Sequence, residues 1–234
     1  MFYYPMFYDS TYILVMIGVV ICLLASAKMN AVFSRYSRVR SHSGMTGRDA
    51  AEALLHREGI YDVRIEHISG NLTDHYDPRA KVLRLSDATY NQISVAAIGV
   101  AAHECGHAIQ HARGYAPLNI RSALVPIANF GSSIAWPLIV IGLIMNSQTA
   151  QLFLNLGVLA FSAAVLFQLV TLPVEFNASR RALQILGNTG MLYPDEVKDT
   201  RRVLTAAALT YVAGAASAIL QLLRLLMISN SRRD

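Results

Sequence analysis

The sequence predicts a mainly α-helical membrane protein with about four transmembrane helices and a small α+β domain. The chain has 234 residues, of which 54% are hydrophobic and only 15% are charged. Soluble domains carry roughly 25% charged residues, so this deficit favours residence in a bilayer. Long apolar stretches alternate with polar regions, and a polar region of about 95 residues is long enough for one compact domain.

The first apolar stretch predicts a transmembrane helix over residues 11–28. Residues 1–10 contain neither Lys nor Arg, so the basic start of a cleaved signal peptide is missing and an uncleaved helix is expected. Basic residues lie at the end of this stretch and after it, and they are Lys28, Arg35, Arg38, Arg40 and Arg48. The positive-inside rule therefore predicts that the N-terminus lies outside and that the chain continues in the cytoplasm.

Residues 29–122 are expected to form a cytoplasmic domain in the order helix, strand, strand, helix. Residues 46–57 are amphipathic, which predicts the first helix. Residues 63–66 and 81–85 alternate as strands do, whereas residues 70–77 are polar and predict a loop. We expect the second strand to lie beside the last helix with a free edge, where an extended peptide could pair with it.

Three more apolar stretches predict transmembrane helices, and they are residues 123–145, 150–172 and 203–228. Only a short polar hairpin separates the first two of these. Residues 173–202 are rich in basic side chains, and two crossings return them to the same side as the domain. Within this segment Glu175 directly follows an apolar stretch, where a new helix is expected to start.

The last helix of the domain carries an H-E-x-x-H pattern. His103 and His107 are four residues apart, so on a helix both imidazoles can reach the same metal ion. Zn²⁺ accepts imidazole nitrogen, and a catalytic site needs one more protein ligand and an open position for water. The carboxylate of Glu104 could reach that water as a general base. Burial of these polar groups is costly unless they are paired or bound, which favours a shared metal over unrelated hydrogen bonds.

Ser86 or Ser94 could cap this helix.

Glu175 is the favoured third ligand, because the predicted topology places it on the same side as the two histidines. His111 lies about 12 Å along a helix from His103, which is too far for one ion. Weaker alternatives are the acidic residues of a polar stretch, namely Asp195, Glu196 and Asp199.

Three segments together make the chain resemble the bacterial YugP-like family of membrane-bound neutral zinc metallopeptidases. They are L-T-D-H-Y-D-P at residues 72–78, A-A-H-E-C-G-H-A-I-Q at 101–110 and E-F-N-A-S-R-R-A at 175–182. The chain is more distantly similar to the HtpX-like membrane gluzincins, which also separate H-E-x-x-H from a ligand Glu by a membrane hairpin. This resemblance implies a zincin-like catalytic domain in the bacterial cytoplasmic (inner) membrane.

The same resemblance implies roles for individual residues. His103, His107 and Glu175 would be zinc ligands, and Glu104 would be the general base. Gluzincins often carry an Asp four residues after the ligand Glu, but this chain has Ser179 there. A serine supplies no negative charge, so the group that supports the histidine is left open.

Four further residues have two interpretations each. Arg180 and Arg181 would either stabilise an oxyanion or anchor the helix at a positive-inside boundary. His75 and Tyr76 would either donate hydrogen bonds to a transition state or belong to an ordinary solvated loop.

The sequence thus predicts a zinc metalloendopeptidase that acts at the cytoplasmic face on a peptide or membrane-protein substrate, with the lipid bilayer as its other partner. The alternative is a catalytically inactive, zinc-stabilised scaffold or adaptor, which Glu104 disfavours because a structural ion needs no base. A transporter is disfavoured because the apolar stretches lack paired charges. No basic face with interleaved aromatic residues is present, so no nucleic-acid partner is expected.

Overall fold

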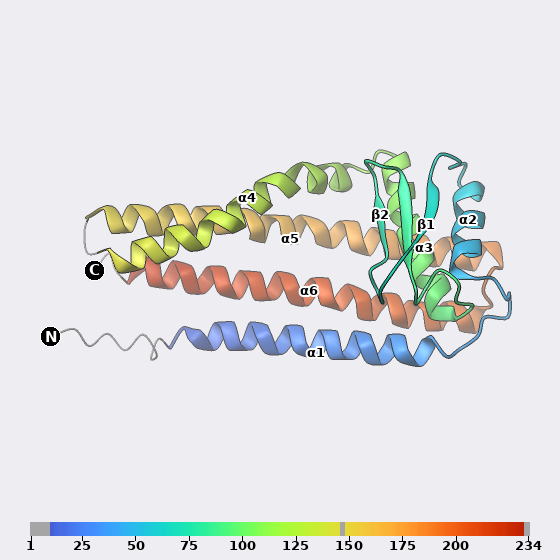
Figure 1. Cartoon of the computed structure of the whole chain (residues 1–234). Coiled ribbons are helices and arrows are strands. Elements are labelled where there is room, and N and C mark those ends of the chain that lie inside the picture. The colour runs from blue at the N-terminus through green and yellow to red at the C-terminus, as the bar shows by residue number, and fades with distance from the viewer. Residues whose placement is uncertain (1–9, 146–147, 232–234) are drawn as a thin grey trace. The chain divides into compact units, whose positions relative to one another are not determined.

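The structure is a computed structural model that describes residues 10–145 and 148–231. Contacts divide the chain into two compact units. The unit that we call the mixed unit comprises residues 26–119 and 171–210, and the helical unit comprises the described parts of residues 1–25, 120–170 and 211–234. Helices and strands follow in the order α1 (Tyr12–Tyr36), α2 (Gly47–Arg57), β1 (Arg64–Ile68), β2 (His75–Asp77), β3 (Val82–Ser86), α3 (Val95–Ala112), α4 (Ala116–Ile144), α5 (Gln148–Thr189) and α6 (Pro194–Asn230) (Figure 1).

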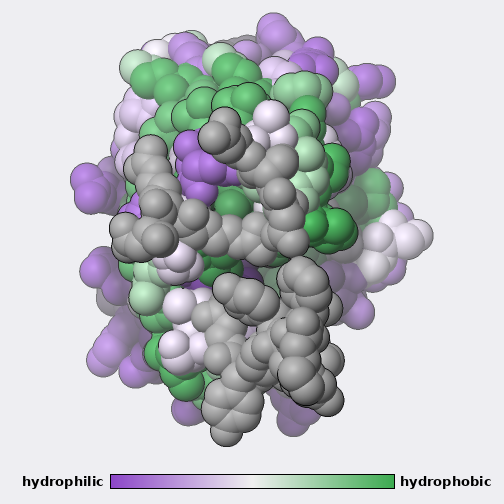
Figure 2. Space-filling view, turned by 90° about the vertical axis from the view of Figure 1, so that its left-hand side faces the viewer, coloured by the Kyte–Doolittle hydropathy of each residue, from purple (hydrophilic) through white to green (hydrophobic). Residues whose placement is uncertain are grey.

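Four of the described helices, α1, α4, α5 and α6, are long and apolar enough to cross a membrane. Large apolar side chains on them are exposed, including Leu24 at 66%, Leu159 at 69% and Ile144 at 76%. Figure 2 shows hydrophobic side chains gathered in the upper part of the face that it views. Exposure on this scale would be unfavourable in water but suits contact with lipid. The predicted fold class, a mainly helical multi-pass membrane protein with a small α+β part, is confirmed.

Small residues let the backbones of the helical unit approach closely. A Cβ atom on Gly131 would lie 2.6 Å from the carbonyl oxygen of Ala160. A Cβ atom on Gly157 would lie 2.6 Å from the side chain of Ile139. Because lipid supplies no hydrophobic drive between helices, such close contacts are a main source of their association.

Helix α5 continues without a break through Pro173 to Thr189, so the predicted start of a new helix at Glu175 is wrong. The end of an apolar run marks a change of surroundings and need not change the backbone conformation. A proline inside a helix can be tolerated where neighbouring groups satisfy the freed backbone atoms. The predicted hairpin before α5 lies partly outside the described residues.

The mixed unit contains a three-stranded sheet in the order β1-β3-β2. Strand β3 pairs in parallel with β1 and antiparallel with β2. The two predicted strands are confirmed, but β2 was missed, because it has only three residues within a polar stretch. The second predicted strand is β3, and the free edge predicted for it is wrong, because β3 pairs with a strand on each side.

The core of the mixed unit lies where α2, the sheet and α3 meet, as a buried cluster that includes Leu54, Leu83 and Ile98 shows. Helix α2 is the predicted amphipathic helix. It begins after Thr46, whose side chain accepts a hydrogen bond from the Asp49 backbone while the Asp49 side chain accepts one from Thr46. This reciprocal pair satisfies backbone donors at the start of the helix.

Candidate metal centre

Helix α3 carries the H-E-x-x-H pattern through the interior of the mixed unit. Ser94 is its N-cap and accepts a hydrogen bond from the Ala97 backbone at 3.1 Å. Ser86, the other predicted cap, instead donates to Asp74 at 2.9 Å. Every residue of α3 from Val95 to Gln110 is buried, which leaves its polar side chains dependent on partners inside the protein.

Helices α3 and α5 are in backbone contact beside the histidines. A Cβ atom on Gly106 would lie only 2.6 Å from the carbonyl oxygen of Ala178. Only a glycine permits so short an approach without a shift of one helix. This contact brings the turn of α5 that contains Glu175 against the histidine face of α3.

Three side chains converge at this contact. One carboxylate oxygen of Glu175, Oε2, lies 3.2 Å from His103 Nε2 and 3.5 Å from His107 Nε2. One ligand atom from each residue lies within 4.8 Å of the other two. The Glu175 side chain is almost fully enclosed, with 2% of the residue exposed.

The spacing and chemistry of this group fit a zinc ion. Ligands about 2.0–2.1 Å from a tetrahedral ion lie roughly 3.3–3.4 Å from one another, which is close to the separations of 3.2 and 3.5 Å between Glu175 and the two histidines. Two imidazoles and one carboxylate are also the set of protein ligands found in one class of catalytic zinc sites. Within the described residues this is the group of His, Cys, Asp and Glu side chains that could hold a metal.

Negatively charged side chains surround His107. Burial lowers the pKa of this imidazole, but its hydrogen bond to the Glu175 carboxylate and the charges of Glu104 and Glu175 outweigh burial and raise the pKa above its ordinary value. Glu104 itself is buried on α3. Negative groups gathered around buried imidazoles favour a bound cation.

The outer nitrogen of each histidine has a polar partner. His103 Nδ1 lies 3.1 Å from Ser179 Oγ, and His107 Nδ1 lies 3.0 Å from Gln110 Oε1. The amide nitrogen of Gln110 donates to the carbonyl oxygen of Val174 at 2.9 Å, so the amide oxygen faces His107. His107 then donates from Nδ1 and keeps the lone pair of Nε2 free for a metal.

Gln110 and Asn177 were missed in the sequence. Gln110 is fully buried, and it also donates to Asn177 Oδ1 at 2.9 Å. A glutamine three residues after the second histidine, on a helix that is otherwise apolar, is the signal that could have revealed the first of them. Asn177 follows Glu175 by two residues, and no local pattern marks it.

The two candidate residues on β2, His75 and Tyr76, form their hydrogen bonds with groups other than the three proposed ligands. Tyr76 shares a hydrogen bond of 2.9 Å with His111 Nδ1, and burial raises the pKa of Tyr76 to about 12. His75 is exposed, and its Nδ1 lies 2.9 Å from the carbonyl oxygen of Thr73. The structure therefore pairs Tyr76 with the end of α3, and it leaves His75 at the surface.

The arginines after Ser179 differ from each other. Arg181 donates to Asn177 Oδ1 at 2.8 Å, and its guanidinium lies 6.0 Å from the ring centre of Tyr115. Arg180 lines a cavity that Ser179 also lines.

The weaker acidic candidates mostly have other partners. Glu196 accepts hydrogen bonds from the backbones of His42 and Tyr193, and Asp199 pairs with Arg202 at 2.7 Å. These contacts favour Glu175 over them as the third member of the group.

Four apolar helices together with a buried His-His-Glu group define a multi-pass membrane protein of the zinc peptidase class. Residues 11–230 match the model of the family described as "Putative neutral zinc metallopeptidase", and the chain belongs to this family. It is 46% identical over 210 residues to "Putative membrane protease YugP" of Bacillus subtilis (strain 168), an alignment that covers 90% of this chain and 92% of that protein. No solved structure matches the chain. The predicted YugP-like family and the zinc cofactor are confirmed.

Proposed function

We propose that this protein is a zinc-dependent endopeptidase that hydrolyses peptide bonds of protein substrates at the cytoplasmic face of the bacterial inner membrane. His103, His107 and Glu175 hold the zinc ion, and Glu104 is the general base. The observation that carries this proposal is the approach of Glu175 Oε2 to within 3.2 Å of His103, across 72 residues of sequence.

Zinc supplies Lewis acidity, which polarises a carbonyl group and acidifies water. The chain's own residues perform the proton transfers. Glu104 takes a proton from the attacking water and delivers it to the leaving amine, which is the usual work of a carboxylate base in such a site. Gln110 and Ser179 fix the outer nitrogens of the histidines, so that both rings keep their orientation toward the site.

The proposed cytoplasmic orientation is supported by the distribution of charge. Basic side chains follow the first apolar stretch, and basic residues recur between the third and fourth stretches. Two crossings separate His107 from Glu175 in the predicted topology, so that both residues lie on the same side of the bilayer. The positive-inside rule makes this the cytoplasmic side.

The Glu104→Gln variant tests the catalytic role, because the amide keeps the shape of the side chain but is no longer a base. We expect zinc content equal to that of the wild type, with peptide cleavage lowered by roughly 10²–10⁴-fold. Purified protein in detergent is assayed with an unfolded protein substrate, and zinc is measured in the same samples.

A matched variant, Glu175→Gln, separates the two roles. It should lose zinc as well as activity, because a neutral amide is a poor replacement for a carboxylate ligand. Full cleavage by Glu104→Gln would exclude the mechanism. Zinc binding without cleavage by the wild type, on substrates from its own membrane, would instead favour a zinc-stabilised scaffold.

A further inference from the structure

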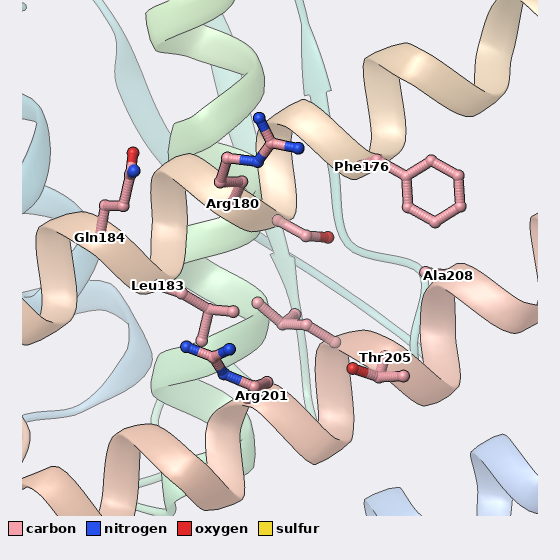
Figure 3. A pocket seen from close by; sticks show the side chains of 9 residues that line it. Phe176, Arg180, Leu183, Gln184, Arg201, Thr205 and Ala208 are labelled. Carbon is pink, nitrogen blue, oxygen red and sulfur yellow. The ribbon is translucent and has the colours of Figure 1, made fainter.

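A cavity of about 580 Å³ lies in the mixed unit, between α5 and α6 (Figure 3). Its walls come from residues of α5 between Phe176 and Gln184 and residues of α6 between Arg201 and Ala208. A volume of this size is typical of pockets that hold small organic molecules.

The charge of the cavity is positive and unopposed. Arg180 and Arg201 line it, and none of its lining residues is acidic. Among the described residues, neither guanidinium forms a hydrogen bond or an ion pair. Their sequence neighbours differ, because Arg181 donates to Asn177 and Arg202 pairs with Asp199. Both arginines are exposed, and their guanidinium groups point in different directions in Figure 3. Two cations at the lining of one cavity, with no acidic residue among them, favour an anionic ligand, and phosphate oxygens match the guanidinium fork.

The lining of the cavity also includes apolar side chains. Figure 3 shows Phe176 and Ala208 at one end, and Gln184 and Arg201 toward the other. Phe176 follows the predicted apolar stretch of α5 by four residues, and Ala208 lies inside that of α6. The end with Phe176 and Ala208 is thus nearest to the apolar stretches of both helices, whereas Arg201 lies away from that end, beside Leu183.

The cavity adjoins the metal centre through Ser179. Ser179 lines it, and Ser179 Oγ lies 3.1 Å from His103 Nδ1. The other ring nitrogen, Nε2, is the one that faces Glu175. A peptide bond under attack must lie on the Nε2 side, so this cavity is unsuited to hold it.

We propose that the cavity binds one anionic phospholipid. Arg180 and Arg201 attract the anionic headgroup, and Phe176 and Ala208 contact the apolar part of the molecule. Basic pockets between membrane helices on the cytoplasmic side recognise such headgroups. This binding extends beyond the proposed function, and it requires no catalysis.

The test is a titration of the delipidated, full-length protein in detergent with phosphatidylglycerol or phosphatidylcholine, followed by native mass spectrometry. The wild type should prefer phosphatidylglycerol. Each arginine near a lipid phosphate contributes roughly fivefold in affinity, so Arg180→Gln combined with Arg201→Gln should weaken phosphatidylglycerol binding by about thirtyfold. Phosphatidylcholine binding should change little.

Lys198→Gln is the matched control, because Lys198 is exposed on α6, carries the same charge and is absent from the cavity lining. It should retain the preference for phosphatidylglycerol. Circular dichroism checks that each variant is folded, and Arg201→Gln alone should show the smaller, fivefold loss. The same titration of Glu104→Gln should give wild-type binding, which keeps this result independent of the peptidase assignment.

Several outcomes would overturn the proposal. Equal affinity for the two lipids in the wild type would remove it, as would unchanged phosphatidylglycerol binding in the double variant. An equal loss of phosphatidylglycerol affinity in Lys198→Gln would show that the net charge of the protein, and not the cavity, determines binding. Displacement of the lipid by inorganic phosphate or by an acidic peptide of similar affinity would assign the cavity to that ligand instead.

Discussion

Gln110 joins the two elements of the metal centre through a single buried side chain. Its oxygen accepts from His107 Nδ1, and its amide nitrogen donates to the backbone of Val174, the residue before Glu175. One glutamine thus orients a proposed ligand on α3 and fixes the turn of α5 that carries another. Mutation of such outer partners typically lowers metal affinity or activity by roughly 10–100-fold.

Replacement of Gln110 by methionine tests this role at the scale of one residue. Methionine has a similar volume but offers neither the acceptor nor the donors. Zinc affinity, measured by competition with a chelator, should fall by roughly 10–100-fold.

Gln110→Glu is the informative control, because it keeps an acceptor for His107 but loses the donors to Val174. We expect it to bind zinc more tightly than Gln110→Met. Wild-type affinity in the methionine variant, with helix content unchanged, would show that Gln110 merely fills space.

At the scale of the helix, the contact between Gly106 and Ala178 determines how closely α3 and α5 approach. Both proposed ligand pairs depend on this approach, since the histidines lie on one helix and Glu175 on the other. A shift of a few tenths of an ångström between the helices would already alter the separations of 3.2 and 3.5 Å that join them.

Gly106→Ala should therefore both destabilise the protein and weaken zinc binding. The added methyl group would lie 2.6 Å from a backbone oxygen, and such overpacking typically costs about 1–3 kcal/mol. Thermal unfolding in detergent and chelator competition measure the two effects.

Gly187→Ala is the matched control on α5, because no atom outside the adjacent helix backbone lies within 4 Å of the added methyl group. An alanine within a helix is favoured over glycine by roughly 0.5–1 kcal/mol, so this variant should be as stable as the wild type or slightly more stable. Equal behaviour of the two variants would contradict the close contact of α3 and α5.

At the scale of the whole molecule, the proposed topology requires the N-terminus and the mixed unit to lie on opposite sides of the membrane. Cys22 and Cys105 are both free, and their replacement by alanine gives a background for single-cysteine labelling. A membrane-impermeant maleimide should label Ser10→Cys on intact cells. It should label Glu52→Cys only after the membrane is opened, and the reverse pattern would contradict the cytoplasmic site.

Much of the fold could be predicted because it depends on local sequence patterns. Four apolar stretches indicated the membrane helices, and Thr46 and Gly59 marked the limits of α2. The spacing of His103 and His107 is likewise local. Glu175 is distant in sequence, and no local pattern links it to the histidines; the predicted topology and the family resemblance did.

What the sequence did not reveal depends on pairing between distant segments. The central place of β3 in the sheet follows from the partner that β2 selects, and β2 is too short for a periodic signal. The continuity of α5 through Pro173 and the hydrogen bonds of Gln110 depend on neighbouring helices. No propensity of single residues contains that information.

Diffraction from crystals of the zinc-loaded protein, with anomalous data at the zinc edge, tests the central claim most directly. The account predicts one zinc peak about 2.0–2.2 Å from a nitrogen of His103, a nitrogen of His107 and an oxygen of Glu175. A peak bound elsewhere, or one beyond bonding distance of Glu175, would contradict it.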